Sequence, residues 1–246
     1  MSNLNIKLLS VVVPAYRQEK TIQTNLERIQ NVLEPTNYNY EIICVVDGLV
    51  DNTYENAKKI NSRNIKVLGY KENQGKGHAV KLGMSKARGD VIAFIDAGLE
   101  LDPETLLMGL EHYKWYKADI IVGSKRHPAS KVDYPWQRRI FSIGYQMMVR
   151  MLFGLKIRDT QLGMKLFKRE VLVNILPKLV VKRYAFDIEM LAVAYYFGFK
   201  RIYESPVEIH YDFKDLTHSS TLKSIIRMFW DTLAVFYRLK ILRYYV

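Results

Sequence analysis

The first 124 residues alternate short apolar runs with segments in which apolar residues recur at helical spacing. The run LLSVVVPAY (8–16) is rich in β-branched residues, as expected of a buried parallel strand, and one apolar helix stripe follows from Ile22 to Leu33. Strands that alternate with helices in this way predict an α/β fold, with a mostly parallel sheet and helices on both faces. Further strands are predicted over 41–48, 65–70, 90–96 and 118–123, and further helices over about 52–60, over 76–87 and from Pro103 onward.

In such a sheet, ligands bind beyond the carboxyl ends of the strands. Functional residues are therefore expected within 14–19, 47–53 and 96–100 and in the segment after Gly123.

Length and composition indicate a globular protein. The chain has 246 residues, of which 49% are hydrophobic and 25% charged, so it has enough apolar surface to fold. Cys44 is the single cysteine, which excludes an internal disulfide and suits a reducing compartment. The first residues lack the pattern of a secretory signal, and no run of about 18 apolar residues predicts a membrane span. We therefore expect a cytoplasmic location.

The net charge of +12 lies entirely in the second half of the chain. Residues 1–124 carry 15 Lys and Arg and 15 Asp and Glu, whereas residues 125–246 carry 22 and 10. This asymmetry favours a phosphate-bearing ligand, a nucleic acid or an anionic membrane as partner, and a solvated basic surface is the alternative. No helix-turn-helix, RNA-recognition or zinc-finger pattern occurs, so we expect no nucleic acid partner.

The second half is less regular in sequence. It opens with a basic loop over 124–135. The patterns then predict an amphipathic helix over 136–153, a loop leading into a strand over 158–167, a buried helix over 185–198, a strand over 200–211 and a long helix over the last 26 residues.

Asp96 ends an apolar strand in FIDAGLELDPE, where a carboxylate can hold a divalent cation against a phosphate. A helix-capping or turn aspartate is the alternative. Five segments favour the metal: VVVPAYRQE, EIICVVDGLVDNT, NQGKGHAVKLGMSKARGD, the Asp96 segment and DTQLGMKLF. In this order, from about residue 9 to 211, they resemble glycosyltransferase family 2, in particular its dolichyl-phosphate and polyprenyl-phosphate hexose synthases.

The resemblance implies a GT-A fold that binds a nucleotide-diphosphate sugar with Mg²⁺ or Mn²⁺ and inverts the anomeric centre. Because the sequence has no internal repeat, low-complexity tract or flexible linker, we expect one domain over 1–217, with a nucleotide-binding half (1–124) and an acceptor half (125–217), followed by a C-terminal amphipathic helix (218–246). The nucleotide-sugar residues by position are Pro14, Ala15, Tyr16, Gln18, Asp47, Lys76 and Asp96, and those of the acceptor are Lys125, Arg126, Arg138, Ser142, Asp159, Gln161 and Lys165.

The resemblance gives catalytic roles to Asp96, Lys125, Arg138 and Asp187, with Asp96 as the metal ligand. Asp187 matches an acidic element near the sugar. Glu189 stands two residues further on, and on a helix only one of these two carboxylates is expected to face the site.

Three positions depart from the family pattern. Gly98 replaces the second carboxylate of the usual Asp-Ala-Asp, and we expect Glu100 to supply the missing ligand. Val46 replaces the first aspartate of the usual Asp-Asp-Gly-Ser, which leaves the nucleobase open, and Gln18 stands where an acidic residue is common.

The acceptor is expected to be a phosphate. An alcohol acceptor needs a general base, whereas a phosphate monoester is already an anionic nucleophile at pH 7 and needs cations to position it. Residues 125–169 carry 11 basic and 2 acidic side chains, which suits a phosphate acceptor better than a sugar hydroxyl. The resemblance implies that this phosphate is a polyprenyl phosphate.

The last 26 residues carry 5 basic side chains and 1 acidic side chain beside Trp230, Tyr237, Tyr244 and Tyr245. Cations beside interfacial aromatic rings predict a helix in the plane of an anionic membrane, so we expect peripheral association with its inner face. Packing on the domain itself or on a second subunit, as in a homodimer, is the alternative.

Two other functions remain open on sequence grounds. The same fold can transfer a sugar to a saccharide hydroxyl. Gly98 can also mark a catalytically degenerate subunit that only binds its ligands.

Overall fold

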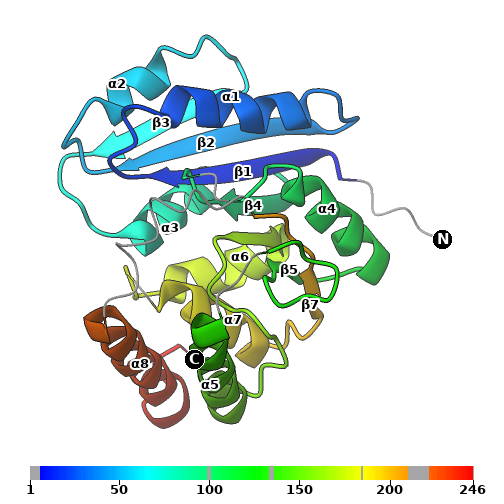
Figure 1. The fold of residues 1–246 in the computed structure, drawn as a ribbon, viewed down its shortest axis with the longest axis vertical. Coiled ribbons are helices and arrows are strands. Elements are labelled where there is room, and N and C mark those ends of the chain that lie inside the picture. The colour runs from blue at the N-terminus through cyan, green and yellow to red at the C-terminus, as the bar shows by residue number, and fades with distance from the viewer. Residues whose placement is uncertain (1–5, 99–100, 133–135, 184, 210–221, 246) are drawn as a thin grey trace.

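The computed structural model describes residues 6–98, 101–132, 136–183, 185–209 and 222–245, and for 136–141 and 222–225 it describes the backbone alone. Within these residues, seven strands form one sheet in the order β3-β2-β1-β4-β6-β5-β7 (Figure 1). The strands are β1 (Leu8–Ala15), β2 (Asn39–Asp47), β3 (Ile65–Tyr70), β4 (Val91–Ile95), β5 (Ile120–Gly123), β6 (Met164–Lys168) and β7 (Ile202–Ser205).

The sheet is parallel except at β6, so the expected architecture is confirmed. β6 runs antiparallel to both β4 and β5, between which it lies. The apolar pattern that predicts the strand is the same for either direction. The antiparallel step therefore could not be predicted from that pattern.

Helices cover both faces of the sheet. α1 (Ile22–Leu33), α2 (Thr53–Lys58) and α4 (Thr105–Tyr116) pack on one face. The other face is covered by α3 (Lys76–Lys86), α5 (Trp136–Phe153), α6 (Arg169–Ile175) with the short 3-10 helix η1 (Leu176–Lys178), α7 (Phe186–Tyr196) and α8 (Leu222–Phe236).

The strands explain this division, because successive residues of a strand point to opposite faces. In β1, Val11 and Val13 join the core on the α1 side, whereas Val12 joins the core on the α3 side. Burial on both faces accounts for the nearly continuous apolar runs. α7 is buried from Phe186 to Ala194, as the sequence predicts, and it carries two carboxylates, Asp187 and Glu189, in its first turn.

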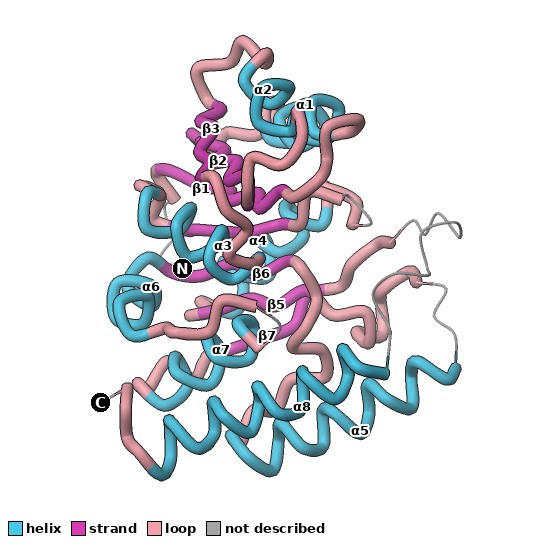
Figure 2. Tube along the Cα trace, turned by 90° about the vertical axis from the view of Figure 1, so that its left-hand side faces the viewer, coloured by secondary structure: helices cyan, strands magenta, loops and turns pink. Residues whose placement is uncertain are grey.

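α5 and α8 lie side by side along one end of the molecule (Figures 1 and 2). Beyond α8 the prediction of a helix to the end of the chain is wrong. A π-helical turn, η3 (Tyr237–Ile241), follows, and the left-handed Arg243, with φ of 49°, turns the chain back. Tyr245 is fully buried, so it lies in the core and not at an interface.

The predicted strand over 200–211 is shorter than expected. β7 ends at Ser205, and Ile209 makes only an isolated bridge with Leu101. Residues 210–211 lie outside the described residues.

Candidate functional site

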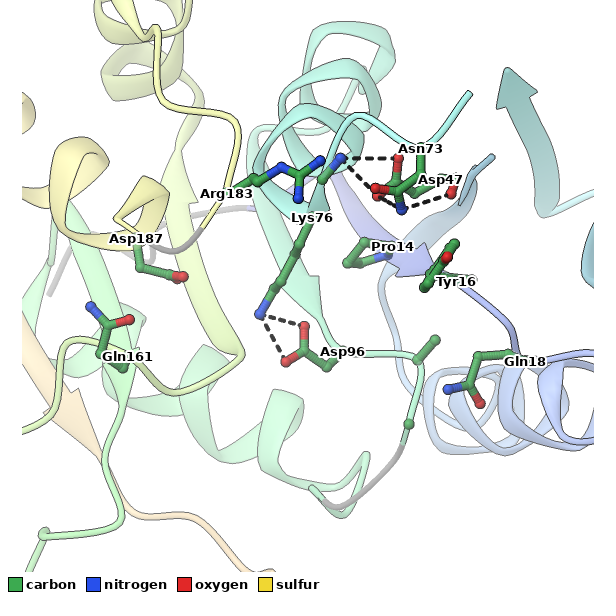
Figure 3. A pocket seen from close by; sticks show the side chains of 14 residues that line it. Pro14, Tyr16, Gln18, Asp47, Asn73, Lys76, Asp96, Gln161, Arg183 and Asp187 are labelled. Atoms are coloured by element: carbon green, nitrogen blue, oxygen red, sulfur yellow. Dashed lines mark hydrogen bonds and ion pairs between the residues drawn. The ribbon is translucent and has the colours of Figure 1, made fainter. Parts of the chain in front are cut away.

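A cavity of about 660 Å³ opens at the carboxyl ends of β1, β2 and β4 (Figure 3). This is where a ligand is expected in such a sheet. All of the predicted nucleotide-sugar residues line it. The full lining is Pro14, Ala15, Tyr16, Gln18, Asp47, Asn73, Gly75, Lys76, Asp96, Ala97, Gly98, Gln161, Arg183 and Asp187.

The first wall of the cavity is the turn after β1. Arg17 is left-handed, with φ of 53°, and the N–H of Gln18 donates to Oγ1 of Thr53 at 2.8 Å, which ties this turn to the start of α2. The turn leaves the Tyr16 ring 40% exposed at the cavity edge. A half-exposed aromatic ring in this position can stack on a nucleobase.

Asp47 ends β2 and supports the next wall. Its carboxylate accepts hydrogen bonds from the Tyr70 hydroxyl at 2.8 Å, from Nδ2 of Asn73 at 2.9 Å, and from the N–H groups of Gln74 at 2.8 Å and Gly75 at 3.0 Å. Burial and the Asp47 carboxylate raise the pKa of Tyr70. Asp47 therefore fixes the loop before α3, and its oxygens are already satisfied without a ligand.

Lys76, at the start of α3, reaches across the cavity to Asp96 at the end of β4. Its ammonium lies 2.7 and 2.8 Å from the two carboxylate oxygens (Figure 3). The two side chains are 38% and 44% exposed, so the pair contributes no more than about 1 kcal/mol. A ligand or a cation can therefore displace either partner at small cost.

The glycines on either side of Lys76 let another part of the chain approach. A Cβ on Gly75 would lie 2.5 Å from the carbonyl oxygen of Lys182, and one on Gly77 would lie 2.7 Å from the Phe186 side chain. The GKG motif is thus required for α3 to pack against the loop that precedes α7.

Asp96 is a carboxylate that could hold a metal ion, because it faces the cavity. The described residues contain no group of three or more Asp, Glu, His or Cys that could hold one alone. Gly98 lines the cavity without a donor, and Glu100 lies outside the described residues. Magnesium is commonly held by one or two carboxylates together with substrate phosphates, and one carboxylate facing a large cavity fits that mode.

Asp187 enters the cavity from the first turn of α7, whereas Glu189 is fully buried in the core. Lys165 is also fully buried, forms an ion pair with Asp187, and donates to the carbonyl of Leu162 at 2.8 Å. Burial lowers the pKa of Lys165, although Asp187 opposes this. Lys165 does not line the cavity itself, and the structure places its ammonium so that it orients Asp187.

Among the other predicted acceptor residues whose side chains are described, Gln161 alone lines the cavity. Asp159 accepts from the N–H groups of Lys125 and Gln161, each at 3.2 Å, and so shapes the loop that carries Gln161. Arg126 donates to Oε1 of Gln146 at 2.5 Å and not to a cavity atom.

Two further acceptor candidates lie on α5. Ser142 is half-buried there, and the side chain of Arg138 lies outside the described part of the chain.

Sequence reasoning missed two polar residues of the cavity. Asn73 holds the carboxylate of Asp47 and stands two residues before Gly75, so it was visible as part of the NQGKG segment. Arg183 lies in the loop before α7 and lines the cavity beside Lys76 (Figure 3). Its only sequence signal was the general excess of basic residues in the second half.

Comparison with known proteins gives a family and close relatives. Residues 10–176 match the family described as glycosyl transferase family 2. A dolichyl-phosphate beta-glucosyltransferase of Drosophila melanogaster is 35% identical over 202 residues, which are 76% of this chain and 62% of that protein. One of Homo sapiens is 33% identical over 207 residues, which are 78% and 64%. The chain thus spans less than two thirds of the length of these relatives.

Solved structures share the fold. A mannosyl-3-phosphoglycerate synthase from Rubrobacter xylanophilus has a TM-score of 0.72 at 18% identity, over 98% of this chain and 76% of that one. A glucosyl-3-phosphoglycerate synthase from Mycobacterium tuberculosis, in complex with Mn²⁺, uridine diphosphate and phosphoglyceric acid, has a TM-score of 0.68 at 18% identity, over 94% and 78%. The expected GT-A fold is confirmed.

Proposed function

Because this chain belongs to glycosyl transferase family 2, we propose that it transfers a hexose from a nucleotide-diphosphate sugar to a polyprenyl phosphate. The observation that carries the proposal is the cavity at the strand ends, where Asp96 and Lys76 face each other between two walls of the predicted nucleotide-sugar residues. The names of the curated relatives support the lipid phosphate as acceptor.

The donor is held through its base and its diphosphate. Tyr16 offers a ring for the base, and the loop fixed by Asp47 presents the start of α3. Lys76 and Arg183 supply positive charge where the leaving diphosphate gains negative charge. Cations placed in advance at the site of developing charge lower the barrier of such a step.

Asp96 is the residue that would hold Mg²⁺ or Mn²⁺. The bound ion would neutralise diphosphate charge as the sugar leaves. In that state Lys76 no longer needs Asp96 as its partner and can turn to a phosphate oxygen. The weak exposed ion pair between them makes this exchange inexpensive.

The transfer is a single displacement with inversion. An acceptor oxygen attacks the anomeric carbon, the carbon–oxygen bond to the donor diphosphate breaks, and the nucleoside diphosphate leaves with the bonding electrons. Asp187 is a cavity carboxylate that could serve as base for a saccharide hydroxyl, but one of its oxygens is already engaged by the ammonium of Lys165. A phosphate acceptor needs no base, which favours the polyprenyl phosphate.

We further propose peripheral association with the cytoplasmic face of a membrane. Among the described residues no helix is both long and apolar enough to cross a bilayer. Apolar side chains are nevertheless exposed along the paired helices: Trp230 is 68% exposed on α8, and Met147 and Met151 are 63% and 82% exposed on α5. Exposed basic residues accompany them, namely Arg227, Lys240 and Arg243. This combination suits an anionic lipid surface.

The proposal is tested by turnover of labelled UDP-glucose and GDP-mannose with a short polyprenyl phosphate in detergent, with Mn²⁺ or with a chelator. We expect a lipid-linked sugar from one donor and only with metal. Asp96→Asn should reduce the rate on the order of a hundredfold. Glu55→Gln, an exposed carboxylate of α2, is the matched control and should leave the rate unchanged.

The other outcomes decide between the remaining functions. A product formed only on added saccharides would replace the lipid phosphate by a sugar hydroxyl as acceptor. Tight nucleotide binding without any transfer would indicate a binding subunit.

A further inference from the structure

Glu189 is a buried carboxylate for which the proposed reaction has no use. It lies on α7 with no exposed surface, and it accepts hydrogen bonds from the N–H of Val181 at 2.9 Å and from the N–H of Val180 at 3.2 Å. It also accepts one from the Tyr245 hydroxyl at 2.6 Å, and Arg238 lies 3.6 Å away. Glu189 therefore joins α7, the loop before it and the last turn of the described chain.

The loop that Glu189 holds forms part of the candidate active site. Its residue Arg183 lines the main cavity. The neighbouring Lys182 accepts the N–H of His78 at its carbonyl and donates from its ammonium to Oε1 of Gln74 at 3.2 Å, next to Gly75. A shift of this loop would therefore move Arg183 and press on the start of α3, where a Cβ on Gly75 already has no room.

The loop and the C-terminal helix do not pack directly along their whole length. A second cavity, of about 470 Å³, lies between them and is lined by Gln74, Val181, Lys182, Arg183, Asp231 and Arg238. The hydrogen bonds of Glu189 connect the two sides of this space. Arg238 strengthens the junction, because its guanidinium also donates to the Tyr245 hydroxyl at 3.3 Å.

Another chain of hydrogen bonds connects α8 to the same main cavity. Nε2 of Gln161, which lines the cavity, donates to the Tyr145 hydroxyl on α5 at 3.2 Å. That hydroxyl lies 2.9 Å from Oγ1 of Thr232 on α8, and Thr232 is anchored to the carbonyl of Met228 at 2.7 Å. The C-terminal segment thus reaches the cavity from two sides: α8 through Gln161, and the residues after α8 through the loop that carries Arg183.

We propose that Glu189 and Tyr245 form a positioning pair that holds the loop over 180–183, and with it Arg183, in the geometry that binds the donor diphosphate. The C-terminal segment is then a support of the active site as well as a surface for the membrane. Packing alone would not require this pair, because a buried carboxylate is costly to desolvate and apolar residues fill such a space at least as well. The role in donor binding rests on the proposed function, whereas the restraint on the loop does not.

The test uses the full chain and the variant Tyr245→Phe, which keeps the ring and removes the hydrogen bond to Glu189. Amide hydrogen exchange of the peptide covering 179–183 should become faster. The Kd of UDP or GDP with Mn²⁺, whichever the wild type binds more tightly, should rise roughly fivefold, and so should KM for the sugar donor. The kcat should fall as well, because Arg183 also faces the charge that develops on the leaving diphosphate. Tyr203→Phe on β7, whose ring stacks on Tyr116, is the control and should leave loop exchange, Kd and KM at wild-type values.

Glu189→Gln and the double variant complete the experiment. Because the two residues act through one contact, the double variant should weaken binding no more than the worse single variant. A merely structural role would lower the melting temperature of Tyr245→Phe and leave loop exchange and Kd at wild-type values, which would overturn the proposal. Faster loop exchange with unchanged Kd would overturn the role in donor binding. Faster exchange and weaker binding in a chain that transfers no sugar would instead retain the pair and contradict the proposed function.

Discussion

Two glycines next to Asp96 have opposite surroundings. A Cβ built on Gly163 would lie 1.8 Å from Oδ2 of Asp96, whereas one built on Gly98 meets no atom within 4 Å. At Gly163 the clash is with the end of a side chain that can rotate, so the fold can accommodate it but Asp96 cannot keep its place. Gly163, the residue before β6, is thus needed to leave room for the Asp96 carboxylate.

Gly163→Ala should therefore impair function more than stability. We expect the melting temperature to fall by only a few degrees, because Asp96 turns away from Lys76, while metal-dependent nucleotide binding weakens at least tenfold. Gly144→Ala on α5, where a Cβ also meets nothing within 4 Å, is the control and should leave binding unchanged. Wild-type binding by Gly163→Ala in a titration with UDP or GDP and Mn²⁺ would contradict the assignment of Asp96.

Gly98→Asp should restore a second carboxylate where there is room for it. The fold should tolerate the change, and the Mn²⁺ concentration that gives half-maximal nucleotide binding should fall roughly tenfold, because a second hard oxygen ligand joins Asp96. Gly98→Asn has the same size without the charge and should improve metal use much less. Equal behaviour of the two variants would show that the carboxylate at this position does not meet the ion.

At the scale of elements, the junction of β2, β3 and α3 depends on one carboxylate. Asp47→Ala removes the acceptor shared by Tyr70, Asn73 and the N–H of Gly75, and it leaves buried donors unpaired. We expect a loss of about 3 kcal/mol, seen as a fall of roughly 6–12 °C in melting temperature, together with loss of nucleotide binding. Glu72→Ala, in the same loop but exposed, should change neither, and an equal loss in both variants would contradict the role of Asp47.

The sequence was most informative where the cause of an element is local. Apolar runs and the stripe from Ile22 to Leu33 predicted the strands and helices. Motifs at the strand ends predicted most of the residues from Pro14 to Asp96 that line the cavity, although not Asn73. Arg183 was missed because it reaches the cavity through a loop held by Glu189, a contact that no short pattern encodes. The burial of Lys165 was missed because its partner Asp187 lies 22 residues further along the chain.

Where long-range contacts determine the end of an element, the sequence pattern could not predict that end. The last residues continue an apolar, aromatic and basic helical pattern, which predicted a helix to residue 246. The chain instead turns at Arg243, because the Tyr245 hydroxyl finds a buried acceptor in Glu189. The sequence periodicity predicts the helix, but it does not predict the contact with the distant Glu189 at which the chain turns.

At the scale of the whole molecule, part of the basic excess of the second half lies on the pair of helices α5 and α8. The α5 and α8 pair lies at one end of the molecule, on the sheet face opposite α1 and α4 (Figure 2). It combines exposed apolar side chains with part of the basic excess of the second half. Two occupants suit such a surface, an anionic membrane and a second subunit, and they differ in how binding responds to lipid charge and salt.

A comparison of Trp230→Ser with Trp115→Ser distinguishes a membrane from a second subunit as the occupant of this surface. Both side chains are strongly exposed, at 68% and 79%, but Trp115 lies on α4, across the sheet from α8. Removing Trp230 should weaken co-sedimentation with anionic vesicles roughly tenfold, because burial of a large aromatic side chain contributes about 1.5–3 kcal/mol, and Trp115→Ser should bind like the wild type.

Salt should weaken wild-type vesicle binding, because Arg227, Lys240 and Arg243 act by charge, and neutral vesicles should bind poorly. Equal vesicle binding by the two tryptophan variants would show that this surface does not bind the membrane. If light scattering then showed a dimer that Trp230→Ser dissociates, the α5 and α8 pair would be a subunit interface. Such an interface buries the Trp230 side chain between two protein chains, so its stability would not depend on lipid charge.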